Sequence, residues 1–180
     1  MISTATGSMA GPMLVVEHPG APNAARMVWT AVPDATRRSI DLAEGEDIFT
    51  AIHALLDAEG ALGGTFTLLS GTLASLTLMT GGRGSDTPMT FHGPFEITAP
   101  ARVVGGAGIV GVDEDGRRTT HCHAVFCDAS LQTVGGHLIA GKAIAGPGGM
   151  MLDLTLLNGA RFARRHDDET NFIIFHPEPA

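Results

Sequence analysis

Charged side chains are scarce in this sequence, and lysine is nearly absent. Charged residues make up 17% of the chain, and Lys142 is the single lysine among 11 basic residues, against 19 acidic ones. A protein that binds bare duplex DNA gains most of its affinity by neutralising phosphates with lysine and arginine. The net charge of −8 therefore argues against a DNA-binding surface of that kind.

The shortage of charge also bears on assembly, because few groups remain to solvate the outside of a single copy. Apolar surface that stays exposed on one chain is commonly covered by identical partners. We therefore expect the chain to form a homo-oligomer.

Long apolar runs are missing as well. No stretch approaches the ~18 apolar residues of a membrane helix, and residues 1–10 lack the basic start and apolar core of a secretion signal. Cys122 and Cys127, the two cysteines, lie five residues apart and would face opposite sides of one strand, so they cannot bridge each other. These features predict a cytoplasmic protein with reduced thiols and no membrane partner.

The residues that are abundant favour short strands joined by turns. Hydrophobic residues reach 44%, with 24 glycines and 10 prolines, which is too apolar for disorder and too rich in turn formers for a helical bundle. A chain of 180 residues fits one domain. We predict an N-terminal arm or hairpin over residues 1–36 and the domain itself over residues 37–177.

One helix is predicted, from an N-cap at Asp47 to a terminating Gly60, because the apolar residues at 48–56 would share one helical face. The other apolar runs resemble strands, and Asp115-Gly116 suits a tight hairpin turn. The pattern predicts an α+β fold in which one main α-helix packs on a mostly antiparallel β-sheet. The expected strands are 37–42, 65–69, 73–80, 89–91, 95–98, 102–112, 117–126, 134–144, 150–157 and 172–175.

Three histidines fall in the two strands of the second predicted hairpin. His121 and His123 are two residues apart and would project from the same face of one strand, with Cα atoms about 6.6 Å apart. If the hairpin pivots near Ser130, His123 stands opposite His137 and the three imidazoles converge, whereas a slip of one residue would turn His137 away. Such a set suits Zn²⁺ or another first-row divalent ion, with an open fourth position.

Spacing alone leaves a second interpretation of these histidines open. A histidine pair in a strand is often a surface or core pair with backbone partners. The Gly135-Gly136 pair before His137 favours the metal site, because paired glycines in a strand indicate a bulge or a close approach of backbones that would aim the side chain. Cys127 lies roughly 13 Å along the strand from His123, too far to join the same site.

With these motifs the sequence resembles the plants-and-prokaryotes-conserved (PPC) domain family. The resemblance covers roughly residues 37–175, and the combination of the two histidine motifs with Gly-x-Phe-Glu-Ile is its most specific part. The matching motifs, in the order of the family, are Gly45-Glu46-Asp47-Ile48, Leu69-Ser70-Gly71, Gly93-Pro94-Phe95-Glu96-Ile97, His121-Cys122-His123-Ala124-Val125, Gly135-Gly136-His137-Leu138 and Phe162-Ala163-Arg164-Arg165.

The resemblance implies a homotrimer and, as in the prokaryotic members, a zinc ion on His121, His123 and His137. The resemblance also implies the DNA-binding and regulatory role that is commonly assigned to the family. The plant members owe that role to AT-hook motifs that precede the domain, and no Arg-Gly-Arg-Pro type AT-hook is present here. DNA binding therefore carries over as an association with the plant relatives and not through residues of this chain.

Three functions remain open at this stage. The first is a zinc-binding, homotrimeric module with a DNA-binding or regulatory role, and the second is a metal-dependent hydrolase or lyase that acts on a small molecule at the three histidines. The third is a trimeric scaffold whose zinc only holds the hairpin. For the enzyme, Glu96 is the candidate general base, although a structural glutamate is the alternative. Arg164 and Arg165 would either bind an anionic substrate or pair with Asp167 and Asp168.

Overall fold

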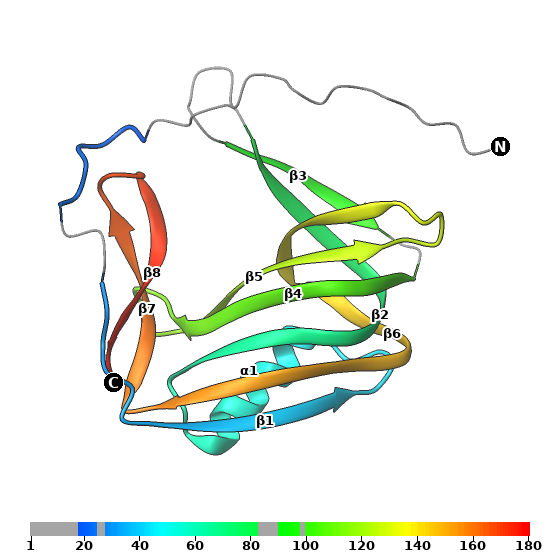
Figure 1. The fold of residues 1–180 in the computed structure, drawn as a ribbon, viewed down its shortest axis with the longest axis horizontal. Coiled ribbons are helices and arrows are strands. Elements are labelled where there is room, and N and C mark those ends of the chain that lie inside the picture. The colour runs from blue at the N-terminus through cyan, green and yellow to red at the C-terminus, as the bar shows by residue number, and fades with distance from the viewer. Residues whose placement is uncertain (1–17, 25–27, 83–89, 98–99) are drawn as a thin grey trace.

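The computed structural model describes residues 18–24, 28–82, 90–97 and 100–180. An eight-stranded sheet dominates it, in the order β3-β2-β6-β5-β4-β7-β8, with β1 paired to β6 (Figure 1). The pairings are antiparallel except where β4 meets β7, and one helix completes the α+β fold that the sequence predicts. The elements are β1 (Asp34–Leu42), α1 (Ile48–Glu59), β2 (Gly63–Gly82), β3 (Thr90–Ile97), β4 (Ala101–Val112), β5 (Arg118–Cys127), β6 (Thr133–Asn158), β7 (Ala160–Asp167) and β8 (Phe172–Pro179).

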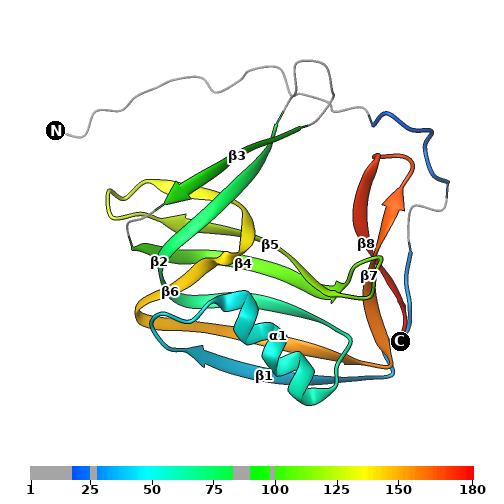
Figure 2. The same ribbon diagram turned by 180° about the vertical axis from the view of Figure 1, so that it is seen from behind.

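The helix begins and ends where the sequence indicates. The carboxylate of Asp47 accepts a hydrogen bond from the backbone N–H of Thr50 at 2.9 Å, and Gly60 ends the helix in the left-handed conformation with φ 66°. The apolar face of α1 packs on the sheet near β6, as Figure 2 shows. Phe49 meets Phe66 of β2 edge to face, with ring centroids 6.4 Å apart.

Side chains alternate between the two faces of the sheet. Phe66 of β2 and Leu154 of β6 are buried on the helix side. Their neighbours Thr65, Thr67 and Thr155 point to the opposite face, where they are half-buried or exposed. His121 and His123 share this second face, because Cys122 between them is buried on the helix side.

Two strands are much longer than the sequence indicates. The runs 65–69 and 73–80 belong to one strand, β2, and the runs 134–144 and 150–157 belong to β6, which spans 26 residues. The glycine-rich links that we expected to separate strands are taken up as irregularities within the ladder, where the register between β2 and β6 shifts four times. Gly71, with φ 117°, is one such link, since a Cβ there would lie 2.4 Å from the carbonyl oxygen of Gly149.

The length of these strands determines which strands meet. β2 pairs with β4 as well as with β6, β6 pairs with β5, and β5 pairs with β4, so that these four strands form a closed ring of pairings. Only the first part of β6, Thr133 to His137, pairs with β5. The ring therefore joins β5 and β6 at the point where the histidines lie.

The chain ends depart from the expected arm and C-terminal segment. Within the predicted arm, residues 28–32 form no strand, and residues 1–17 and 25–27 lie outside the described residues. Gly20 instead donates a hydrogen bond from its N–H to the carbonyl oxygen of Glu169 at 2.8 Å, so that this segment lies against the β7–β8 turn. The basic and acidic stretch after residue 160, for which we expected no strand, forms β7, and it is paired along its length with β8.

The N-cap offers a test of the helix. Asp47→Ala removes the acceptor for the Thr50 N–H and should lower the free energy of unfolding by about 1 kcal/mol. Asp47→Ser should keep most of that stability, and Glu44→Ala, an exposed carboxylate outside the helix, should change it by less than about 0.5 kcal/mol. Urea unfolding followed by circular dichroism measures all three, and equal losses for Asp47→Ala and Asp47→Ser would contradict the capping role.

Candidate metal centre

Three imidazoles converge on the face of the sheet opposite the helix. His123 pairs directly with His137 in the β5–β6 ladder, which is the register that the sequence predicts for a hairpin pivoting near Ser130. The ring centroid of His121 lies 4.7 Å from that of His123 and 4.7 Å from that of His137. One ring nitrogen from each residue lies within 4.8 Å of the other two.

The turn between β5 and β6 fixes that register. One carboxylate oxygen of Asp128 accepts hydrogen bonds from the backbone N–H groups of Ser130 and Gln132, both at 2.9 Å. Gly136 then lets β6 approach β2 closely, since a Cβ at this position would lie 2.5 Å from the carbonyl oxygen of Met79. The glycine pair before His137 therefore marks a close approach of backbones rather than a bulge, and the β5–β6 register continues through it without a shift.

The donor set fits a metal ion. Imidazole nitrogens ~2.0 Å from one tetrahedral ion are about 3.3 Å apart, and the ring nitrogens of the three histidines lie within 4.8 Å of one another. The Nδ1 atom of His137 is buried and has no hydrogen-bond partner among the described residues. A buried polar atom without a partner is costly, and a bound ion would satisfy it.

Burial in the cluster favours the neutral form of His121 and His137. Burial lowers the pKa of His121 to about 4, with further contributions from His137, His123 and Arg164. Burial also lowers the pKa of His137, followed by the charges of His123 and Arg164. Neutral imidazole is the form that binds a metal ion, so both ligands are ready at pH 7 without losing a proton.

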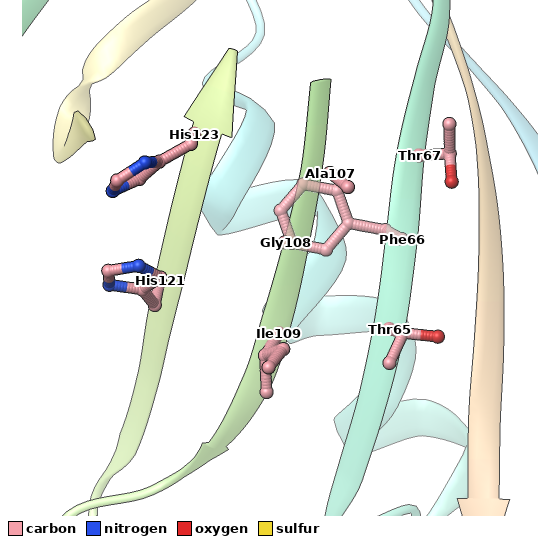
Figure 3. A pocket seen from close by; sticks show the side chains of 8 residues that line it. All are labelled: Thr65, Phe66, Thr67, Ala107, Gly108, Ile109, His121 and His123. Atoms are coloured by element: carbon pink, nitrogen blue, oxygen red, sulfur yellow. The ribbon is translucent and has the colours of Figure 1, made fainter. Parts of the chain in front are cut away.

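A groove runs beside the histidines. It has a volume of about 390 Å³, and His121 and His123 form one side of it. Figure 3 shows both imidazoles projecting from β5 toward the same side, next to β4 and β2. The remaining lining residues come from β2 and β4: Thr65, Phe66, Thr67, Ala107, Gly108 and Ile109.

No fourth histidine, cysteine, aspartate or glutamate joins the three histidines in the part of the chain that the structure describes. Cys122 and Cys127 are free thiols outside the cluster, and Cys122 is buried. Glu96 lies on β3, exposed and paired with Thr77 of β2, and it belongs neither to the cluster nor to the groove lining. Its role as a general base stays a prediction.

Arg164 and Arg165 have different surroundings in the structure, although the sequence pattern does not distinguish them. Arg165 forms an ion pair with Glu178 at 3.0 Å, rather than with Asp167 or Asp168. Arg164 has no ion pair among the described residues, and its charge acts on His121 and His137. Arg164 lines a small cavity together with Asp113, Glu114, Asp115 and Ile173.

Sequence reasoning missed a small network that connects the helix to β5. His53 is half-buried on the polar face of α1, and its Nε2 lies 2.6 Å from the hydroxyl of Thr120. Arg118 binds Asp57 at 2.6 Å and also donates to the carbonyl oxygen of Ala61. The i to i+4 spacing of His53 and Asp57 on the polar helix face was the only available signal. Thr120 directly precedes His121, so this network joins α1 to β5 next to the first histidine of the cluster.

The pKa of His53 predicts how the network responds to pH. Burial, and then the charge of Arg118, lower this pKa from 6.5. The unfolded chain takes up a proton near pH 6.5 while the folded chain resists it, so stability falls as the pH drops below that value. His53→Gln, which cannot titrate, should lose less stability than the wild type between pH 7.5 and 5.5 in urea unfolding. An identical pH dependence in the two proteins would refute the assignment.

Comparison with known proteins agrees with this fold. The family model described as the Plants and Prokaryotes Conserved (PCC) domain matches residues 32–153. No curated protein matches the chain in sequence. The described residues contain no helix that is long and apolar enough to cross a membrane.

Among solved structures, a PPC protein from Pyrococcus horikoshii is 16% identical, with a TM-score of 0.63 over 84% of this chain and 99% of that chain. A protein from Archaeoglobus fulgidus, described as metal-containing, is also 16% identical, with a TM-score of 0.63 over 83% and 98%. A hypothetical protein from Salmonella enterica is 16% identical, with a TM-score of 0.64 over 81% of this chain and 95% of that chain.

Two further neighbours, from Ralstonia eutropha and Bacteroides thetaiotaomicron, carry names that propose DNA binding, with TM-scores of 0.61 and 0.59. At 19% and 16% identity these two show the same fold and no more. The family model spans more than half of the chain, and its range includes the whole histidine cluster. This protein therefore belongs to the Plants and Prokaryotes Conserved domain family.

Proposed function

We propose that the chain binds one divalent first-row metal ion, zinc in the first place, through His121, His123 and His137, and that this centre acts on a small molecule. The observation that carries the proposal is the convergence of three imidazoles within 4.8 Å beside a groove of about 390 Å³. Three histidines without a fourth side-chain ligand are typical of reactive zinc sites, which keep one position for water or substrate.

A bound ion of this kind supplies Lewis-acid chemistry, which serves hydrolysis as well as hydration and dehydration. The chain contributes the positions of its ligands, which are held by the β5–β6 ladder and by the Asp128 turn. The groove beside them would receive the substrate, and Thr65 and Thr67 offer hydroxyl groups along it. We propose Glu96 as the general base, acting from outside the groove lining through water.

We further propose that the active form is a homotrimer. The chain has few charges, and large apolar side chains stay exposed along several strands of the single copy. Burial of such surface is the main source of stability in assemblies of identical chains. The exposed apolar side chains on the strands include Leu69, Phe91, Phe95, Val104, Val125 and Met151.

Metal content tests the proposal directly. Wild-type protein should carry about one zinc per chain in elemental analysis, with three nitrogens and one exchangeable oxygen in X-ray absorption. His123→Ala should lose at least ten-fold in zinc affinity, because two imidazoles then remain. His18→Ala, which changes an exposed histidine outside the cluster, is the matched control.

A closed shell of four protein ligands, without an exchangeable oxygen, would show instead that the metal only holds the hairpin. Zinc that stays bound in His123→Ala with unchanged affinity would place the metal elsewhere. Either result ends the proposal of a reactive centre on these three histidines.

DNA binding is the second candidate, and the names of two structural neighbours favour it. The charge of −8 opposes it, because few cations are available to release counterions from the phosphates. We expect fluorescence anisotropy to show no binding of a 20-base-pair duplex at 150 mM salt and at most weak binding at 20 mM. Submicromolar binding at 150 mM salt would favour the regulatory role over the enzyme.

A further inference from the structure

We propose that α1 positions His121 for metal binding, through its contacts with Thr120 and Arg118 of β5. These two residues touch neither the metal nor a ligand side chain, and they act by fixing the stretch of strand that carries His121. This inference rests on the proposed function, because it concerns the geometry of the same three ligands.

His121 needs such support because it lies outside the ladder that joins β5 to β6. The two strands pair only from His123 to Cys127, so among the described residues the part of β5 before His123 pairs with β4 alone. No described residue forms a hydrogen bond with the His121 side chain. Metal-binding histidines are commonly oriented by a hydrogen bond to the second ring nitrogen. The orientation of His121 therefore depends on how its own stretch of β5 is held.

The helix holds this stretch on the face opposite the histidine cluster. Thr120 points to the helix side, where its hydroxyl lies 2.6 Å from Nε2 of His53. Arg118 donates hydrogen bonds from Nε and Nη2 to one carboxylate oxygen of Asp57, at 3.0 Å and 2.6 Å. Its Nη2 also donates to the carbonyl oxygen of Ala61 at 3.1 Å. Arg118 is only 17% exposed, so its position is fixed by packing as well as by these bonds.

The strand transmits this constraint from one face to the other. Thr120 and His121 are neighbours in β5, so their side chains project to opposite faces. A rotation of the strand that moved Thr120 away from His53 would swing the His121 imidazole on the other face. The hydrogen bond between Thr120 and His53 therefore limits the orientation of the ligand.

The same helix is also joined to β6, the other strand of the cluster. The N–H of Gly45 donates to the carbonyl oxygen of Ala145 at 2.9 Å, and the N–H of Ala145 donates to the carbonyl oxygen of Glu46 at 2.8 Å. These bonds directly precede the N-cap, Asp47, which forms an isolated bridge with Ile144. The helix thus connects β6 to the part of β5 with which β6 does not pair.

A second ion pair of α1 offers a comparison, because it leads away from the cluster. Glu59, at the end of the helix, binds Arg38 of β1 at 2.7 Å. β1 contains none of the three histidines and pairs with β6 along residues 150–158, beyond His137. Comparing Glu59 with Asp57 therefore separates the positioning of His121 from general support of the helix.

The test measures zinc affinity by competition with a chromophoric chelator, on full-length protein that circular dichroism shows to be folded. Thr120→Val removes the hydroxyl, keeps the shape of the side chain and should weaken zinc binding by about three-fold or more, as expected for a residue that acts without touching the ligand. Thr120→Ser keeps a hydroxyl and should bind zinc like the wild type. Thr119→Val, which removes a hydroxyl from the opposite face of the strand, should also leave the affinity unchanged.

The two ion pairs are compared in the same way. Asp57→Ala should weaken zinc binding by a similar factor, whereas Glu59→Ala should not. The visible absorption of cobalt-loaded protein gives a second readout, because the bands of Co²⁺ depend on the arrangement of its ligands. We expect these bands to change in Thr120→Val and Asp57→Ala and to stay as in the wild type in Thr119→Val and Glu59→Ala.

The possible failures of this inference and of the proposed function are distinct. Wild-type zinc affinity and an unchanged cobalt spectrum in Thr120→Val would overturn the positioning role while leaving the metal centre in place. Equal losses in Asp57→Ala and Glu59→Ala would also overturn it, because any weakening of the helix would then have the same effect. Wild-type protein that binds no zinc would instead overturn the proposed function, and this inference with it.

Discussion

The register between β5 and β6 is the constraint on which the candidate centre depends. Side chains in a strand alternate between faces, so a shift of one residue would move His137 to the helix side and leave two histidines on the other. The pairing of His123 with His137 is secured at the turn by Asp128 and on β6 by a glycine that lets the backbones of β6 and β2 approach. The ring of pairings among β2, β4, β5 and β6 holds this hairpin in place.

The two faces of this sheet have separate tasks. One face, together with α1, contains the buried core, which includes Phe49, Phe66 and Leu154. The other face carries the histidines and the groove beside them, which is lined there by Thr65, Thr67, Ala107 and Ile109. The network of His53, Thr120 and Arg118 crosses from helix to sheet just before His121, so the core and the centre are linked at one strand.

Much of this arrangement could be predicted from the sequence. The caps of α1, the Asp115-Gly116 turn and the His123–His137 register follow from local patterns, and the structure contains all of them. The metal site on the three histidines stays a prediction. The long strands could not be predicted in the same way. A glycine such as Gly71 indicates a break when only neighbours in the sequence are considered, whereas pairing with a distant strand carries the ladder past it.

The surroundings of the centre were also beyond sequence reasoning. Arg164 and Arg165 are adjacent and chemically identical, and only the pairing of β7 with β8 separates their environments. The contact of His53 with Thr120 could not be predicted, because the two residues are 67 positions apart in the sequence. Both cases depend on strand pairings between distant segments, which the periodicity of a single sequence does not encode.

Diffraction from zinc-loaded crystals at the zinc absorption edge would test the central claim most directly. We predict one anomalous peak per chain, located between the ring nitrogens of His121, His123 and His137. A peak at another position, or no peak at this cluster in protein shown to contain zinc, would contradict it.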